Sequence, residues 1–489
     1  MAIDQGTSST KSLIFDAAGK AVAKGTEDLH TMYLDNGFVE QDPEAIYRNV
    51  LASVNKCLTA FEKAGFDKEE IVSIGISNQR ETFVVWDKQG RPLHNAVVWQ
   101  CKRSVSICEA LKEKGLAAMV NQKTGLVIDP YFSATKLAWL FQNKEAIKEA
   151  VKNNNAFFGT IDTWLLYKLT RGKEYATDHT NASRTLLFNL HSLHWDEELI
   201  DAFGLTGIKL PAIRSSSSAF GETDAEGLFS NLVPITALIG DSHAAAFGEG
   251  CFEQGTAKAT MGTGCSILMN IGNKPVPSKN GMVTTVCWST EGRIDYALEG
   301  VIVSCGATIE WLKNELHVFA DSKETETMAN AVADNGGVYL VPAFSGLGSP
   351  HWDMERKASI TGMSFSTTKD HLVRAALESI PYQIKDVILA MEKDAGVSLK
   401  ELNADGGITS NRFVMQFLSD LLQKNVTTIG MPDVSALGAA YLAGLQAGVY
   451  EDIGSLKKMN TEKKQQQPSK DNRIAQAGYE GWKKEINRS

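Results

Sequence analysis

The chain has 489 residues, of which 43% are hydrophobic and 22% are charged, a composition typical of a globular protein long enough for two domains. Its formal net charge is -9 and it has no long basic run, which argues against binding to nucleic acid or to an anionic membrane. No apolar stretch reaches the length that spans a bilayer, which argues against an integral membrane protein.

The cysteines indicate a reducing environment. All seven are scattered and none forms a CxxC pair (positions 57, 101, 108, 251, 265, 287 and 305). This spacing argues against a zinc site or a disulfide framework and favours free thiols. The first residues, MAIDQGTSSTK, have no signal-peptide architecture. We therefore expect a cytoplasmic protein.

In chain order, residues 1–29 predict three strands joined by two turns, the second of them at AAGK. A helix is expected from Pro43, because Asp42 can cap it and apolar residues from Ile46 to Phe61 recur with helical spacing. Residues 71–79 and 82–87 predict further strands, and helices alternate with short strands up to about residue 245.

A second cycle of the same kind begins near residue 255. Residues 255–270 predict two strands joined by a Gly/Thr turn, and helices at 306–316, 411–423 and 436–448 and a strand at 402–407 follow. Two cycles that each open with such a hairpin indicate two similar α/β domains facing each other across a cleft. We expect them at residues 1–246 and 247–450. The polar stretch 457–472 predicts a surface linker, so residues 451–489 would form a linker and a terminal helix.

The segment GDSHAAAFGEG, residues 240–250, contains the main candidate for catalysis. Asp241 directly follows an apolar, strand-like run and opens a helix rich in Gly and Ala. A carboxylate in that position can face a cleft and accept a proton from a substrate hydroxyl. The alternative is helix capping, since Asp is favoured at helix N-termini. The other motifs of the chain favour the catalytic interpretation.

The turn DQGTSSTK, residues 4–11, concentrates groups that bind phosphate. Backbone amides in such a turn can form an anion-binding nest, and Asp4 can hold Mg²⁺ directly or through water. The side chains that can donate to phosphate oxygens are Thr7, Ser8, Ser9 and Lys11.

An ordinary hairpin turn has a similar composition, but ATMGTGCS at 259–266 supplies a second Gly/Thr turn. With DGG at 405–407, these turns resemble the nucleotide-binding scheme of the actin-like ATPase and sugar kinase superfamily, while P-loop and protein-kinase motifs are absent from the sequence.

Longer motifs make the resemblance specific. Residues 131–143 (YFSATKLAWLFQN) and 358–378 (ASITGMSFSTTKDHLVRAALE) resemble the two signatures of the FGGY carbohydrate kinases. Other segments, among them SNQRETFVVWD, TDHTNASRTLLFN, YALEG and VPAFSGLGSPHWD, are similar to the glycerol kinase branch of that family. The resemblance implies an α/β fold with two actin-like (ribonuclease H-like) domains around a cleft. It also implies ATP-dependent phosphorylation of the terminal hydroxyl of a small polyol, with glycerol as the first expectation.

The resemblance assigns roles to matching positions. Asp241 would be the general base, and Asp4 would position Mg²⁺. The polyol site would be lined by Arg80, Glu81, Trp99 and Tyr131, and the nucleotide would contact Thr263, Gly306, Gly407 and Asn411 in addition to the donors of the first turn. Neighbours on a regular strand point to opposite faces, so Arg80 and Glu81 can share a pocket only at a strand end or an irregularity. The alternatives are core packing for the two aromatic rings and a solvated ion pair for Arg80 and Glu81.

Two departures from the family pattern bear on the substrate. This chain has Ser266 where an aromatic residue usually follows the GTGC turn, and Ser242 where glutamine usually follows the catalytic acid. We count both among the substrate-binding residues and expect a wider, more polar pocket. The alternative substrate is therefore a longer polyol or a ketose, such as erythritol, a pentitol or xylulose. An actin-like ATPase that acts on no sugar is the alternative from another class. The resemblance implies ATP and Mg²⁺ as cofactors and a homodimer or homotetramer.

Overall fold

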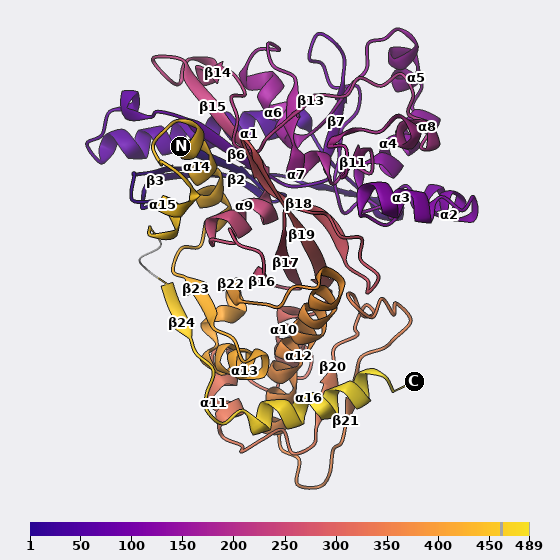
Figure 1. Ribbon diagram of the computed structural model, residues 1–489, viewed down its shortest axis with the longest axis vertical. Helices are drawn as coiled ribbons and strands as arrows, with labels where there is room; N and C mark the ends of the chain where they lie inside the picture. Colours follow the sequence, from indigo (N-terminus) through magenta and orange to yellow (C-terminus); the bar gives the residue numbers. More distant parts are fainter. Residues whose placement is uncertain (460–462, 489) are drawn as a thin grey trace.

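Two large β-sheets, one in each half of the molecule, organise the chain in the computed structural model, which describes residues 1–459 and 463–488 (Figure 1). The first sheet has six strands in the order β14 (Glu222–Thr223), β15 (Val233–Gly240), β6 (Ile74–Asn78), β1 (Ala2–Gln5), β2 (Ser9–Phe15) and β3 (Ala21–Asp28). The second has seven strands in the order β18 (Val283–Thr290), β19 (Arg293–Ile302), β17 (Cys265–Gly272), β16 (Thr256–Met261), β22 (Glu401–Asp405), β23 (Val426–Ile429) and β24 (Lys463–Gln466). We call the parts built around these sheets the first and the second domain.

The two sheets repeat one topology. In the first, the antiparallel strands β3, β2 and β1 continue into the parallel strands β6 and β15. In the second, β19, β17 and β16 are antiparallel and continue into the parallel strands β22 and β23. The expectation of two similar α/β domains, each opened by a Gly/Thr hairpin, is therefore confirmed, and the actin-like fold with it.

Smaller sheets complete the strands. A five-stranded sheet has the order β4 (Met32–Leu34), β5 (Phe38–Gln41), β8 (Ala96–Val97), β7 (Phe83–Trp86) and β9 (Phe157–Thr160). Three pairs consist of β10 (Ala176–Asp178) with β13 (Ala212–Arg214), β11 (Phe188–Asn189) with β12 (His194–Trp195), and β20 (Tyr339–Val341) with β21 (Ser359–Thr361).

Helices cover the sheets of both domains (Figure 1). In the first domain they are α1 (Pro43–Lys63), α2 (Val105–Glu113), α3 (Ala117–Thr124), α4 (Ser133–Asn143), α5 (Glu145–Lys152), α6 (Ile161–Leu169), α7 (His179–Ala182), α8 (Glu197–Ala202) and α9 (Asp241–Gly248). The later ones are α10 (Gly306–Asn314), α11 (Glu324–Asn330), α12 (Lys369–Ala395), α13 (Arg412–Leu422), α14 (Val434–Gln446), α15 (Ile453–Lys457) and α16 (Arg473–Ile486). The described residues include no helix with the length and apolar character needed to cross a membrane.

Helix α1 has the N-terminal cap and the buried apolar stripe that the sequence predicts. Asp42 is its N-cap and accepts a hydrogen bond from the Glu44 amide at 2.9 Å, and Pro43 occupies its first position. Its apolar stripe packs into the first domain's core, where Ile46 and Val50 are fully buried and Leu51 is partly buried.

The polar stretch at 457–472 is more than the linker that the sequence predicts. Lys463–Gln466 forms β24, which pairs antiparallel with β23 at the edge of the second sheet. Lysine and glutamine suit an edge strand because their side chains remain exposed there. Residues 460–462 lie outside the described residues. The predicted terminal helix is α16, which buries Tyr479 and Trp482 in a cluster with Tyr382 of α12.

Small residues bring α14 against α9, the helix that begins at Asp241. A Cβ atom on Gly438 would lie 1.8 Å from the Ala244 carbonyl oxygen, and one on Gly248 would lie 2.5 Å from that of Val434. A Cβ on Gly75 of β6 would lie 2.2 Å from the Ala439 carbonyl oxygen. The α14 backbone therefore packs directly onto α9 and the first sheet, although sequence reasoning assigns α14 to the second domain.

We predict that Gly438→Ala destabilises the protein by about 1–3 kcal/mol, because the added methyl overlaps the Ala244 carbonyl oxygen and forces the two helices apart. Urea unfolding measures the change. Ala440→Ser, at a partly buried position of the same helix, is the control and should stay near wild type. Equal stability of Gly438→Ala and wild type would contradict the close helix contact.

Candidate functional site

The carboxyl ends of the parallel strands bring the predicted catalytic residues to one edge of the first sheet. Asp4 of β1 lies opposite Ser77 of β6, and Gly240 of β15 lies opposite Asn78. Asp241 directly follows β15 and therefore emerges at the edge where β1 also ends. In α/β sheets this is the edge at which ligands bind.

Arg80 and Glu81 lie in the short connection between β6 and β7, at the irregularity that a shared pocket requires. Glu81 has a φ of 60°, in the left-handed region, which breaks the alternation of a strand. The Arg80 side chain is 6% exposed and the Glu81 side chain 1%. The alternative of a solvated ion pair is therefore wrong. Instead, both side chains enter one buried charged cluster.

This buried cluster contains two arginines and two glutamates. Arg80 Nη2 donates to Glu299 Oε1 at 2.8 Å, and Arg184 Nη1 lies 2.6 Å from Glu299 Oε2. Arg184 Nε donates to Glu81 Oε1 at 2.5 Å. Burial alone would raise the pKa of Glu299, but the positive charges of Arg184 and Arg80 hold it well below its usual range. Glu299 is therefore ionised. Burial raises the pKa of Glu81 above its usual value, although the charges of Arg184 and Arg80 act in the opposite direction.

Asp241 combines a local anchor with an open carboxylate. It is the first residue of α9, and Gly240 rather than Asp241 is the N-cap. Asp241 Oδ1 accepts from the Ser242 amide at 2.6 Å and lies 3.4 Å from Arg80 Nε. Its side chain is still 38% exposed. The arrangement leaves the carboxylate available to a ligand, as a general base requires.

The aromatic rings of Trp99 and Tyr131 form a wall beside the charged cluster. Their centroids are 5.5 Å apart with the planes at 66°. Trp99 Nε1 donates to Thr7 Oγ1 at 3.0 Å, and the buried Lys136 ammonium donates to the Tyr131 carbonyl oxygen at 2.7 Å. Both residues are half-buried and pack against a hydrophobic core cluster, so core packing accounts for part of their surface. The Thr7 hydroxyl, predicted to bind phosphate, thus also fixes this wall.

The first turn is tight, and two of its predicted donors, Thr7 and Lys11, are already paired. The Gly6 amide donates to the Ser9 carbonyl oxygen at 3.0 Å, and Ser8 at the tip is exposed. The Lys11 ammonium lies 3.1 Å from Asp433, which Lys24 also contacts at 2.6 Å. In this structure Lys11 connects the turn to the start of α14.

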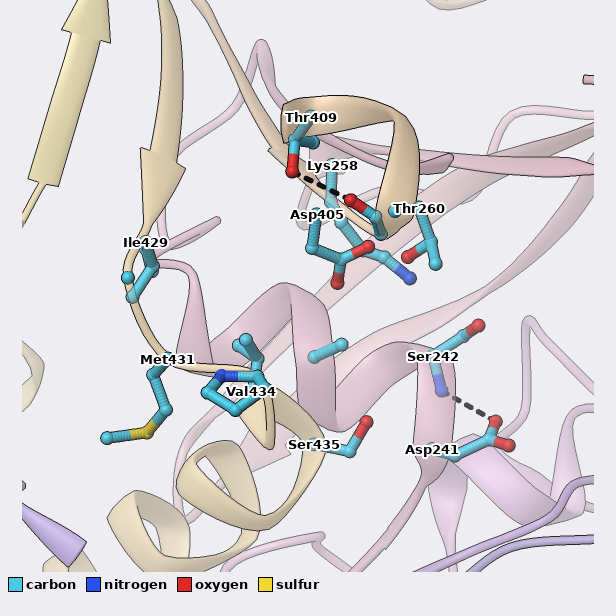
Figure 2. Close-up of a pocket in the computed structure, with 15 residues that line it drawn as sticks. Asp241, Ser242, Lys258, Thr260, Asp405, Thr409, Ile429, Met431, Val434 and Ser435 are labelled. Carbon is cyan, nitrogen blue, oxygen red and sulfur yellow. Dashed lines mark hydrogen bonds between the residues drawn. The ribbon is translucent and has the colours of Figure 1, made fainter. Parts of the chain in front are cut away.

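A pocket of about 650 Å³ opens between the two domains, where the strand ends of both sheets face each other. Figure 2 shows Asp241 and Ser242 on one side of it and Lys258, Thr260 and Asp405 on the other. Gly407, one of the predicted nucleotide residues, also lines it. Sequence reasoning missed Lys258 and Thr260. The sequence feature that could have identified them is their spacing: residues two apart on a strand such as β16 point to the same face of the sheet.

The other predicted nucleotide residues of the second domain lie beyond the lining of this pocket. The Gly306 amide donates to the Gly262 carbonyl oxygen at 2.9 Å, and a Cβ on Gly306 would lie 2.7 Å from that oxygen, so the turn requires glycine. Thr263 is exposed in the β16–β17 turn. Asn411 caps α13 by accepting from the Val414 amide at 3.1 Å.

The two unusual serines border the carboxylates of the site. Ser266 Oγ donates to Glu299 Oε1 at 3.4 Å, and Ser242 follows Asp241 on α9. His243, the next residue, is fully buried. Burial and the Arg80 charge lower the pKa of His243 well below its usual value, so its imidazole is neutral.

The environment of Asp4 suits a divalent cation. Burial raises the pKa of Asp4 to about 6, and the nearby Asp241 charge acts in the same direction, while Ser77 Oγ donates to Asp4 Oδ1 at 2.9 Å. A cation would favour the ionised form of this carboxylate. The described residues contain no group of three or more His, Cys, Asp or Glu side chains that could hold a metal ion. A cation at Asp4 would therefore take most ligands from water and a nucleotide, as Mg²⁺ commonly does.

Comparisons with known proteins agree with this geometry. Residues 1–248 match the N-terminal domain, and residues 257–447 the C-terminal domain, of the FGGY family of carbohydrate kinases. The chain is 45% identical over 490 residues to a protein named glycerol kinase from Thermoanaerobacter sp. (strain X514), covering 100% of this chain and 98% of that protein. It is 45% identical over 487 residues to one from Bacillus cereus (strain Q1), with 99% and 98% covered. The crystal structure of Plasmodium falciparum glycerol kinase with ADP superposes with a TM-score of 0.94 at 35% identity, covering 99% of this chain and 97% of that one.

Proposed function

The chain belongs to the FGGY family of carbohydrate kinases, and we propose that it transfers the terminal phosphoryl group of ATP to a terminal hydroxyl of glycerol, giving sn-glycerol 3-phosphate and ADP. The observation that carries the proposal is the open carboxylate of Asp241 at a strand edge, beside the buried Arg80 and Glu81. Similarity to glycerol kinases over almost the whole chain supports the choice of acceptor. Family membership argues against an ATPase that acts on no sugar.

In this reaction Asp241 would accept the proton of the attacking hydroxyl. Its distance of 3.4 Å from Arg80 Nε and its anchor on the Ser242 amide favour one orientation of the carboxylate. Arg80 would donate to hydroxyl oxygens and Glu81 would accept from hydroxyl hydrogens, while Trp99 and Tyr131 would contact the carbon chain. Phosphoryl transfer passes through a loose transition state, so these residues mainly position the acceptor and exclude water.

ATP would occupy the pocket between the domains, with Thr7, Ser8, Ser9, Lys11, Thr263, Gly306, Gly407 and Asn411 as its proposed contacts. Asp4 would hold Mg²⁺, which neutralises charge on the phosphates when bound. The half-buried Lys11 also contacts Asp433, and its ammonium group has three donors to share between that carboxylate and a phosphate. Lys258 and Thr260 line the same pocket and add polar groups to it.

We further propose a cytoplasmic protein that forms homodimers or homotetramers and binds neither nucleic acid nor membrane. All seven cysteines are free and buried, which suits a reducing compartment. The net charge of -9 disfavours polyanionic partners other than a nucleotide held by local donors. The oligomeric state rests on family resemblance.

A longer polyol or a ketose is the second candidate substrate, and Ser266 favours it. The Ser266 hydroxyl lies 3.4 Å from Glu299 Oε1, the same oxygen that accepts from Arg80, so this position borders the acceptor site. A serine fills little volume there and adds a hydroxyl, which leaves space for water or for an additional carbon with its hydroxyl.

We predict that Asp241→Asn folds normally and loses about 10²- to 10⁴-fold in turnover, because the change keeps the shape but removes the proton acceptor. Asp4→Asn should instead raise the Mg²⁺ concentration needed for half-maximal rate as well as slow the reaction. Steady-state kinetics at several Mg²⁺ concentrations separates the two effects. A near wild-type rate for Asp241→Asn would contradict the role of Asp241 as general base and leave it a structural role at the start of α9.

We predict that Ser266→Phe raises kcat/KM for glycerol relative to erythritol by about 10- to 200-fold, because an aromatic ring restores contact with a three-carbon ligand and removes space for a fourth carbon. Ser266→Ala, which removes the hydroxyl without filling the space, is the matched control. If Ser266→Phe leaves the glycerol-to-erythritol ratio unchanged, position 266 does not determine acceptor length.

A further inference from the structure

The acceptor side of the site receives one charged residue from the second domain. Arg80, Glu81 and Arg184 all belong to the first domain, whereas Glu299 projects from β19 of the second sheet. The Glu299 side chain is 2% exposed. Its two oxygens contact the two arginines at 2.8 and 2.6 Å. One carboxylate therefore bridges both guanidinium groups across the domain boundary.

Glu299 depends on the first domain for its charge balance. Among the described residues both of its ion pairs go to first-domain arginines, and its second-domain contact is the longer hydrogen bond from Ser266 at 3.4 Å. A buried carboxylate without a cationic partner is strongly disfavoured. The same holds for Arg80, whose side chain is 6% exposed and whose Nη1 makes no hydrogen bond. The carboxylate of the second domain and the arginines of the first domain therefore stabilise each other in their buried positions.

The dependence extends to the catalytic carboxylate. Arg80 uses Nη2 for Glu299, which leaves Nε at 3.4 Å from Asp241 Oδ1, while Nη1 is buried without a hydrogen-bond partner among the described residues. Arg184 uses Nη1 for Glu299 and Nε for Glu81. If Glu299 moved away with the second domain, both guanidinium groups would lose a partner. Arg184 would keep its contact with Glu81, but Arg80 would keep only the longer contact with Asp241 at 3.4 Å.

We propose that Glu299 is a positioning residue that couples the two binding sites: a bound nucleotide stabilises the arrangement in which Glu299 contacts Arg80 and Arg184, and this arrangement fixes the residues of the polyol pocket. The proposal rests on the proposed function, which places nucleotide contacts in both domains, among them Thr263, Gly306, Gly407 and Asn411 of the second, and most polyol contacts in the first. It means that Glu299 contacts neither substrate and yet makes their binding interdependent.

The test measures polyol affinity by titration calorimetry with and without a non-hydrolysable ATP analogue and Mg²⁺. In wild type the analogue should tighten polyol binding by about 5- to 150-fold, the usual range of such coupling. In Glu299→Gln the factor should fall close to one, while affinity for the analogue alone stays within about twofold of wild type. Glu299→Asp, which keeps the charge on a shorter side chain, should recover part of the coupling.

Glu378→Gln is the matched control. Glu378 is also a buried glutamate paired with an arginine, since Arg374 Nε donates to it at 2.7 Å, but both lie on α12 within the second domain. This variant should lose stability without losing coupling. Unchanged coupling in Glu299→Gln, or an equal loss of coupling in Glu378→Gln, would overturn the proposal.

A separate wild-type assay keeps the two proposals distinguishable. Turnover with glycerol and with erythritol identifies the polyol that the enzyme accepts, and the calorimetry uses that polyol. A wild type that phosphorylates erythritol but not glycerol contradicts the proposed acceptor and leaves the coupling experiment unchanged. A wild type whose polyol affinity is the same with and without the analogue overturns the role of Glu299.

Discussion

The bridge from Glu299 to Arg80 and Arg184 is the interaction on which the acceptor site depends. It is buried, it pairs one carboxylate with two guanidinium groups, and it crosses the boundary between the domains. Without it, two guanidinium groups would stay desolvated beside the pocket with half of their partners. With it, Arg80 lies at a defined distance from Asp241, and Glu81 is held in its left-handed conformation by Arg184.

The rest of the architecture supports this contact from both sides. Parallel strand polarity brings Asp4 and Asp241 to one edge of the first sheet and Thr260 and Asp405 to the facing edge of the second. The backbone contact of α14 with α9 fixes the helix that carries Asp241. Side chains of β18 also bond to the first domain, as Ser289 does with His179 at 3.0 Å. The two domains are therefore joined beside the acceptor, and the pocket opens between their strand ends.

The local signals in the sequence predicted much of this. The two Gly/Thr hairpins, the cap and stripe of α1, and Asp241 at a strand end all follow from near neighbours in the chain, and strand alternation required the irregularity at Arg80 and Glu81. The pairing of Arg184 with Glu299 could not be predicted, because the partners are distant in sequence and no local pattern encodes their contact. The same applies to Thr7, whose hydroxyl accepts from Trp99. The strand β24 was missed because edge pairing of backbone groups overrides a polar, low-complexity composition.

This arrangement would position a polyol for phosphoryl transfer from ATP. The most direct test is ADP release by the wild-type protein, followed with a coupled assay, without acceptor and with glycerol, tetritols, pentitols and ketoses in turn. We predict slow release without an acceptor and strong stimulation by glycerol or a closely related polyol, with one phosphorylated polyol formed for each ADP. A rate of ADP release that is the same with and without every polyol tested would contradict the account.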